Sequence, residues 1–390
     1  NIKYSIKKRE ANFIDFRKPT VRHDESLQKE NVMTDKINPD RTKTLEELFQ
    51  ENGLPSPTKG FKKLLSGGAI GDIERSLTNL FQGLNHRQNP GVISINRDTP
   101  GLVLFSRPQL NMVDGNLVNN RDLAGLLNPD RNSYARVFRV MFDERLPGLG
   151  IDTDLFYNDS PFMNILTNTL INMSGWPDMA SPTHTSDPGL FKEEIAWVDG
   201  VNKVRYAFDI TCNFQNIEGD PINSLFQYWT TYASLAFMGG ISMRNYFITR
   251  KRIDYGIGIW RLVLDESKTT IIKIARSGLG AFPLNVRTGS SFDYDINTPI
   301  NANNNEISQS FKVIGADYND PILYKEFNDL IYFYNDGMQD ATRDKLFIKI
   351  PMAIIGMFNF KGTPHINLKT KELEWWVDRE TWNYTIGAEG

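Results

Sequence analysis

The sequence predicts an α+β fold in which antiparallel β-hairpins form a sheet or a tube-like barrel, with flanking helices and an extended N-terminal arm. One observation behind this prediction is a pair of apolar segments joined by a polar turn within residues 255–275. A second is the order of elements, because strand pairs interrupted by single helices at 221–237 and 321–334 differ from alternating βαβ units. A third is the composition of residues 1–60, which are too polar to fold alone.

The central hairpin has the clearest signal. Its first arm, Ile257 to Leu264, places apolar residues on both faces, and its second arm, Thr269 to Ala275, is rich in isoleucine. Residues 265–268 supply the polar turn. A strand that is apolar on both faces must be covered on both sides, by its own domain or by a neighbouring chain. The glycine-rich stretch 275–292 is too apolar for a free loop, so we expect it to lie against another surface.

The remaining elements follow from periodicity and from turn residues. Helix 221–237 begins at Pro221, ends before Gly239 and carries a wide apolar stripe. Asp199-Gly200 predicts a tight turn inside a second hairpin at 191–213. Further helices are expected at 70–84, 123–127, 134–142, 162–173 and 321–334; further strands at 102–106, 246–248, 307–313, 346–350, 354–360, 366–368 and 374–377; and a loop containing His184 at 177–188.

The chain divides into three regions in this prediction. Residues 1–60 form an extended N-terminal arm, residues 61–188 a mainly helical region, and residues 189–390 an antiparallel β-rich domain. Phe13 and Phe16 are small apolar anchors on the polar arm. Two alternatives fit such anchors: an arm that docks on a neighbouring subunit, and a solvated tail.

Net charge and cysteine content exclude several classes of protein. The chain of 390 residues has a formal net charge of −3, so no overall field favours nucleic acid. Residues 1–63 hold 14 Lys and Arg against 10 Asp and Glu, whereas the rest of the chain holds 30 against 37. The single cysteine, Cys212, excludes an intrachain disulfide and is typical of a reducing compartment. No apolar run reaches about 18 residues, so we expect a soluble, non-secreted protein.

No sequence motif indicates catalysis, a cofactor or a metal. The sequence lacks a nucleophile elbow, a P-loop and a strand–GxGxxG–helix unit, and its histidines have no neighbour at metal-ligand spacing. Paired acids could act as general acid and base, but such pairs are common on exposed strands. The pairs are Asp152/Asp154, Glu193/Glu194 and Glu372/Glu374. We therefore predict a protein that is not an enzyme, with no catalytic, cofactor or metal residues; hydrolysis by one pair is the alternative.

Basic and aromatic residues mix between Arg244 and Tyr255. Arg250, Lys251 and Arg252 form the charged centre of this segment. Such a mixture could bind a phosphate backbone, or it could form a subunit interface, where Arg and Tyr are favoured. The acidic body of the chain favours the interface, and direct nucleic-acid binding is kept as a second alternative.

Two short sequence motifs carry a family resemblance. The first, Phe105-Ser-Arg-Pro-Gln-Leu-Asn111, is similar to a TRPxLN phrase, with Ser106 in place of threonine. The second runs from Gly258-Ile-Trp-Arg-Leu-Val-Leu-Asp265 to Gly280-Ala-Phe-Pro283. Both resemble structural proteins in the virions of large contractile-tailed bacteriophages. The resemblance implies a place in the tail, baseplate or neck, where tube-like proteins pair hairpins around a ring, and it carries no catalytic residues.

We therefore expect a structural component of a phage virion that is assembled in the host cytoplasm. It would be a subunit of a tail, baseplate or neck ring, and its partners would be copies of itself and other virion proteins, with no membrane. The alternatives are a virion-associated hydrolase and a nucleic-acid-binding virion protein. The residues that we expect at subunit contacts are Phe13, Phe16, Arg107, Trp260, Phe282, Arg250 and Arg252.

Overall fold

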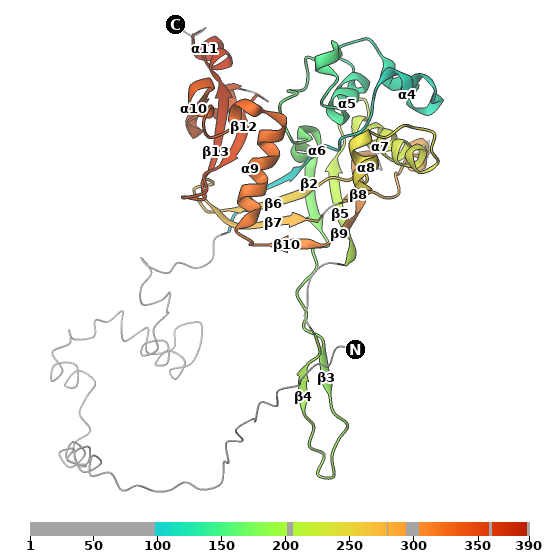
Figure 1. The fold of residues 1–390 in the computed structure, drawn as a ribbon, viewed down its shortest axis with the longest axis vertical. Coiled ribbons are helices and arrows are strands. Elements are labelled where there is room, and N and C mark those ends of the chain that lie inside the picture. Colours follow the sequence, from blue (N-terminus) through green and yellow to red (C-terminus); the bar gives the residue numbers. More distant parts are fainter. Residues whose placement is uncertain (1–97, 201–205, 279, 294–303, 359–360, 388–390) are drawn as a thin grey trace, which may run out of the picture. The chain divides into compact units, whose positions relative to one another are not determined.

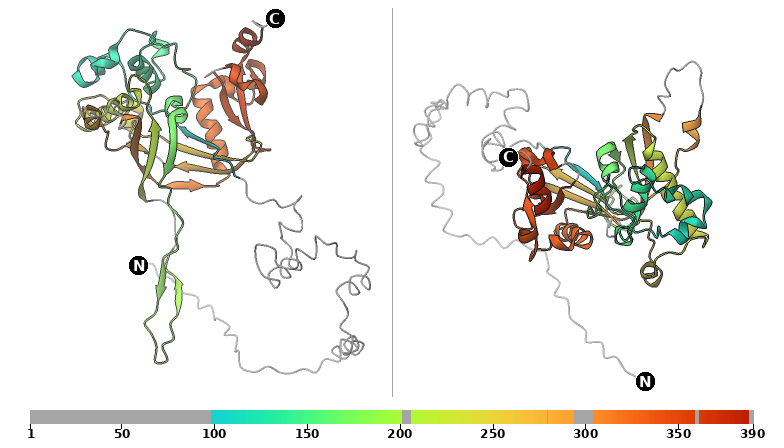
Figure 2. Two further views of the ribbon diagram at one scale, coloured as in Figure 1. Left: turned by 180° about the vertical axis from the view of Figure 1, so that it is seen from behind. Right: turned by 90° about the horizontal axis from the view of Figure 1, so that it is seen from above.

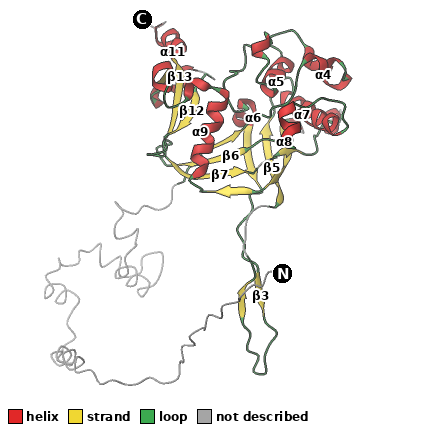
Figure 3. Cartoon of the chain, in the orientation of Figure 1, coloured by secondary structure: helices red, strands yellow, loops and turns green. Residues whose placement is uncertain are grey.

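Two four-stranded sheets form the centre of the described part of the chain (Figure 1). The computed structural model describes residues 98–200, 206–278, 280–293, 304–358 and 361–387. The paired strands are antiparallel, and helices are interspersed among the sheets, as Figure 3 shows. This arrangement confirms the α+β class.

The described strands pair in four sheets. The first sheet has the order β1-β6-β7-β10, the second β2-β5-β9-β8 and the third β11-β13-β12, while β3 and β4 pair as a two-stranded sheet. None of these described sheets closes on itself, so the predicted tube-like barrel is not found in this part of the chain. The strand bounds are β1 Leu102–Phe105, β2 Leu170–Ser174, β3 Thr183–Thr185, β4 Ala196–Val198, β5 Ala207–Gln215, β6 Ile259–Leu264, β7 Ile271–Ser277, β8 Phe282–Pro283, β9 Glu306–Ile314, β10 Ala316–Tyr318, β11 Phe347–Lys349, β12 Thr363–Ile366 and β13 Leu373–Asp378.

The predicted and observed helices agree best where the apolar stripe in the sequence is long. The helices predicted at 134–142, 221–237 and 321–334 are confirmed as α5, α7 and α9. Among the described helices, none has the length and apolar character needed to cross a membrane. The α-helices are α4 Asp114–Val118, α5 Tyr134–Phe142, α6 Asn164–Thr169, α7 Pro221–Phe237, α8 Asn245–Arg250, α9 Ile322–Tyr334, α10 Arg343–Leu346 and α11 Arg379–Gly387; the 3-10 helices are η2 Arg121–Leu127, η3 Pro147–Leu149, η4 Gly289–Phe292, η6 Asp336–Met338 and η7 Met352–Phe358.

The first sheet contains the predicted central hairpin. β6 pairs with β7, and β1 lies beside β6 on its other edge (Figure 2). Asp265 fixes the turn by accepting hydrogen bonds from the backbone N–H groups of Thr269 and Thr270. Helix α9 packs on this sheet, where the Phe327 ring meets the Trp260 ring edge-on with centroids 5.3 Å apart. The face of the hairpin that carries Trp260, Leu262 and Ile274 is thus covered within its own chain, whereas Val263 is half-buried and Ile272 is exposed.

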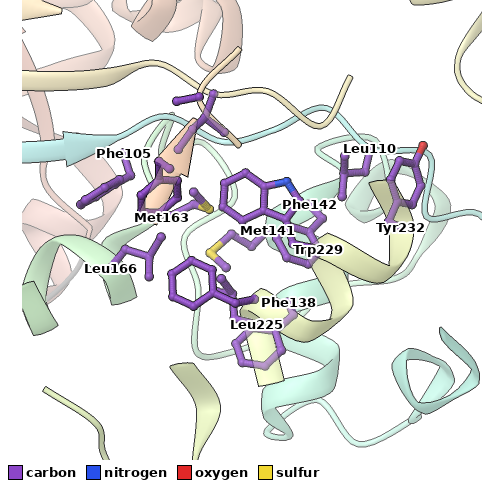
Figure 4. Packing of buried hydrophobic residues seen from close by; sticks show 14 of the residues in the cluster. Phe105, Leu110, Phe138, Met141, Phe142, Met163, Leu166, Leu225, Trp229 and Tyr232 are labelled. Atoms are coloured by element: carbon purple, nitrogen blue, oxygen red, sulfur yellow. The ribbon is translucent and has the colours of Figure 1, made fainter. Parts of the chain in front are cut away.

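Strands β5 and β9 of the second sheet alternate between buried residues and residues with more exposed side chains. Every second residue of β5, from Phe208 to Phe214, is buried, and β9 alternates in the same way. The nine residues of β5 pair one to one with the nine residues of β9. A period of two buries one face of each strand. That face packs against helices α5 and α7, and together they form the main hydrophobic core (Figure 4).

The third sheet holds a buried histidine. His365 of β12 is 4 % exposed, and its Nε2 accepts a hydrogen bond from Arg343 Nη1 at 2.6 Å. Glu374 of β13 lies 3.8 Å from the Nδ1 atom of the same ring, and the hydroxyl of Tyr332 is 3.1 Å from Nε2. Burial, together with the charge of Arg343, lowers the pKa of His365 to about 4.

This shift predicts a loss of stability in acid. The folded chain binds fewer protons at His365 than the unfolded chain between roughly pH 6.5 and pH 4, so stability falls as the pH decreases through that window, by about 3 kcal/mol in total. Urea denaturation at about pH 7 and about pH 4.5 would measure the fall. His365→Gln should remove about 2 kcal/mol of the difference between these two pH values. An unchanged difference in the variant would show that other groups, such as Glu374, cause the acid sensitivity.

The hairpin predicted around Asp199-Gly200 is wrong. β4 pairs with β3, whereas β5 pairs with β2 and with β9. The buried face of β5 needs a long partner strand, which β9 supplies and the three residues of β4 cannot. The expected loop at 177–188 accordingly contains β3.

Three shorter predictions are also corrected. The strand expected at 246–248 lies in helix α8, where only Phe247 of the three side chains is buried, as one helical turn allows. The strand expected at 354–360 belongs, through Phe358, to the 3-10 helix η7. The helix expected at 162–173 ends at Thr169, because the following residues pair with β5 as strand β2. The helix expected at 70–84 lies outside the described residues, and the region boundaries at 60 and 188 stay predictions.

Candidate assembly surface

The hairpin formed by β3 and β4 carries large apolar side chains that are exposed to solvent. We call residues 183–198 the hairpin segment. Leu190 is 90 % exposed and Phe191 is 87 % exposed, and Ile195, Trp197 and Val198 are exposed as well. Contiguous exposed apolar surface on a soluble protein marks a site of contact with another molecule.

Hydrogen bonds give the tip of the hairpin segment a defined turn. The backbone N–H of Gly189 donates to the carbonyl of Glu193 at 2.9 Å, and the N–H of Phe191 donates to the Glu193 carboxylate at 2.7 Å. Lys192 adopts a left-handed backbone with φ of 62°. The segment is acidic, because Asp187, Glu193 and Glu194 outnumber Lys192. It is therefore an ordered surface with both apolar and acidic character.

A buried guanidinium organises the region between β1 and α5. Arg107 is 4 % exposed, and it donates hydrogen bonds to the backbone carbonyls of Val140 and Met141, each at 2.8 Å. Its plane lies over the rings of Phe156 and Tyr334, with distances of 5.0 and 4.9 Å to their centroids. Burial lowers the pKa of Arg107. The side chain thus ties β1, α5 and α9 together.

A second arginine holds the start of helix α8. Arg244 contacts the carboxylates of Asp143 at 2.9 Å and Glu144 at 2.6 Å, and its side chain is 10 % exposed. Burial alone raises the pKa of Asp143, but the hydrogen bond from Arg145 and the charge of Arg244 outweigh it and hold that pKa below its usual range. Charge-assisted hydrogen bonds of this kind are about twice as strong as neutral ones. The guanidinium of Arg244 is therefore bound by carboxylates of its own chain.

A pocket lies beside the end of helix α8. Its volume is about 450 Å³, and its walls come from the ends of β1 and β7, from residues 247–258 and from Leu330 and Tyr334 of α9. We call it the α8 pocket. Asp254 on its wall is fixed by a hydrogen bond of 2.5 Å from the hydroxyl of buried Tyr232. Lys251 and Arg252 are exposed at the pocket, and neither forms an ion pair with a described residue.

Comparison with known families identifies the class of protein. A family model described as "Putative phage tail tube protein" matches residues 54–390, which is most of the chain. The chain belongs to this family of phage tail tube proteins. The resemblance to phage virion proteins is thereby confirmed, and the protein is a component of the virion with a structural role in the tail. Tail tube proteins assemble with copies of themselves and with other virion proteins.

Two further comparisons add little to this assignment. Among solved structures, the cap that terminates the tube of an anti-feeding prophage is similar, with 15% identity over 38% of this chain and 78% of that chain. Its TM-score of 0.23 is too low to establish a shared fold. Comparison with curated proteins gives no match.

The structure places the predicted contact residues of this tail tube protein in different environments. Arg250 and Arg252 are exposed, and the Arg250 guanidinium lies 4.5 Å from the centroid of the Tyr246 ring. Trp260 is 1 % exposed, within its own core, and Phe282 is half-buried against Tyr255. Arg107 is buried as described above, and Phe13 and Phe16 lie outside the described residues. Their roles in subunit contacts stay predictions, and among the five that the structure describes only Arg250 and Arg252 present an exposed side chain.

At least one member of each carboxylate pair is an ion-pair or hydrogen-bond partner. Arg131 contacts both Asp152 and Asp154, at 3.0 and 2.8 Å. Glu374 is buried and contacts Lys349 at 2.9 Å. Among the residues that the structure describes, no group of three or more His, Cys, Asp or Glu side chains could hold a metal ion.

The predictions made from the sequence identified neither the hairpin segment nor the α8 pocket. The apolar residues of the hairpin segment resemble core residues until their exposure is known. The pocket combines residues from 106 to 334, which no local pattern links. The signal that could have located the surface is the acidic, apolar composition of 187–195, which lies between Pro182 and Trp197.

Proposed function

We propose that copies of this chain assemble into a ring that forms part of the tail tube. The observation that carries this proposal is the hairpin segment, where Leu190 and Phe191 are almost fully exposed in the single chain. Burying one large apolar side chain is worth about 1.5–3 kcal/mol, so a neighbouring subunit that covers this segment gains substantial stability. Membership of the tail tube family supports the same conclusion.

The open sheets provide a second kind of contact. β1 and β10 are the edge strands of the first sheet, and β2 and β8 are those of the second. Edge strands carry unpaired backbone groups that can pair with another chain. A ring built from such subunits would use both sheet edges and exposed side chains.

Native mass spectrometry and negative-stain microscopy of the purified chain would test this proposal. We expect rings for the wild type, alone or after mixing with tail components. Replacing Leu190 and Phe191 with serine should raise the protein concentration needed for assembly by about tenfold or more, because these side chains then add no apolar burial. Circular dichroism should show an unchanged fold.

Leu149→Ser is the matched control, because Leu149 is an exposed leucine at the end of η3, outside the hairpin segment. This variant should assemble like the wild type. A wild-type chain that stays monomeric at high concentration and in the presence of tail components would contradict the ring.

A further inference from the structure

The α8 pocket is positively charged and also apolar. Arg107, Lys251, Arg252 and Arg276 line it against one acidic residue, Asp254. Arg276 is paired with Glu326, so Lys251 and Arg252 supply the positive charge at the rim. Its apolar wall is formed by Phe247, Ile253, Ile257, Ile314 and Leu330. A ligand for this pocket needs an apolar group for the wall and negative charge for the rim.

The hairpin segment has the complementary composition. Its tip exposes the phenyl ring of Phe191 next to the acidic residues Glu193 and Glu194. A buried phenylalanine side chain removes roughly 150–250 Å² of surface from water, and the α8 pocket offers a volume of about 450 Å³ for it. The exposed cations Lys251 and Arg252 have no acidic partner among the described residues, and Glu194 has no basic one. Charge and apolar character thus match on both surfaces.

We propose that the tip of the hairpin segment of one copy docks in the α8 pocket of a second copy, with Phe191 against Ile253 and the glutamates facing Lys251 and Arg252. This inference rests on the proposed function, because it names the surface through which copies meet. It makes the contact heterologous, since the hairpin segment and the pocket are different surfaces of the chain. Heterologous contacts generate rings or continuous stacks rather than closed dimers.

Disulfide trapping between two different chains, each with one introduced cysteine, tests the contact directly. One chain carries Phe191→Cys, and the other, with a larger tag, carries Ile253→Cys. The native Cys212 is buried, and its burial raises the pKa of the thiol, so it does not compete. We expect a mixed disulfide of the two tagged chains on mild oxidation. Chains with Phe191→Cys mixed with chains carrying Leu149→Cys should give no product above background, and equal yields in both mixtures would overturn the proposal.

Charge reversal gives an independent readout. Glu194→Lys should weaken assembly by about tenfold, and so should Arg252→Glu, because each places like charges opposite one another. Glu193 is left unchanged, because its carboxylate accepts the hydrogen bond from the Phe191 N–H that shapes the tip. A chain with both substitutions should recover assembly, since the charges are complementary again. Assembly of both single variants at the wild-type concentration, or a double variant no better than the singles, would overturn the proposal.

The outcomes separate this inference from the ring itself. Rings without the specific disulfide leave the proposed function standing and reject the docking site. The specific disulfide without rings supports the docking site and rejects the ring. Both measurements use the full chain, and both substituted apolar side chains are exposed, Phe191 at 87 % and Ile253 at 40 %.

Discussion

Replacing Arg107 with methionine is expected to lower the free energy of unfolding by about 3–5 kcal/mol. The guanidinium donates hydrogen bonds to the carbonyls of Val140, Met141, Asn158 and Ser160. Methionine fills much of the same space but donates nothing, so buried carbonyl groups lose their partners. An unsatisfied buried polar group costs about 1–3 kcal/mol.

Urea denaturation followed by tryptophan fluorescence would measure this change. Arg250→Met is the control, because Arg250 is exposed and its guanidinium lies over the aromatic ring of Tyr246 at the surface. Its expected effect is within about 0.5 kcal/mol. Similar losses in the two variants would show that the buried hydrogen bonds of Arg107 contribute little to stability.

The motif at residues 105–111, which carries part of the family resemblance, stabilises the fold. In residues 105–111, Phe105 and Leu110 are fully buried, and Arg107 ties β1 to α5. The sequence identified these residues and predicts Arg107 at a subunit contact, a role that stays a prediction. It did not predict the burial of Arg107, because a lone arginine beside proline gives no sign of burial. Only the surrounding carbonyl groups, which come from positions 33 to 53 residues away, explain its place.

Regular periodicity allowed the larger elements to be predicted. α7 begins at Pro221 and ends at Phe237, as its stripe and the following glycines indicate. The alternation in β9 and in the β6–β7 hairpin also gave correct strands. In these elements, the local pattern and the buried face of the fold agree.

Predictions failed where partners are chosen by the tertiary structure. Asp199-Gly200 is a strong local turn signal, but β5 pairs over its whole length with β9, about a hundred residues further along the chain. The segment 246–248 has the composition of a strand, yet Arg244 is fixed by two carboxylates at the start of a helix. Such choices depend on long-range contacts that a sequence window does not contain.

The candidate assembly surface could not be predicted from the sequence either, because it too depends on the tertiary structure. Leu190 and Phe191 have the side chains of core residues, and only the finished fold shows that no other described element covers them. The cations of the 244–252 segment could be found in the sequence. The sequence did not show that Arg244 is ion-paired within the chain whereas Lys251 and Arg252 are exposed.

Trp229→Ala is expected to lower the free energy of unfolding by about 3–5 kcal/mol, a large part of the total for a typical domain. Trp229 is fully buried in the main core, and Figure 4 shows its indole beside Phe142. The ring centroids of Phe142 and Phe311 lie 6.2 Å from it, and its Nε1 donates to the carbonyl of Tyr255 at 2.8 Å. Alanine leaves a cavity between α5, α7 and β9 and an unsatisfied carbonyl. Urea denaturation would measure the loss.

Trp197→Ala provides the matched control. Trp197 is 48 % exposed on β4, in the hairpin segment, so its removal leaves no core cavity and should change stability by less than about 0.5 kcal/mol. The two variants therefore separate folding from assembly: the first should unfold at a lower urea concentration, and the second should remain folded while assembling less readily. Equal losses of stability would mean that the hairpin segment belongs to the folding core, and the assembly surface would have to be sought elsewhere on the chain.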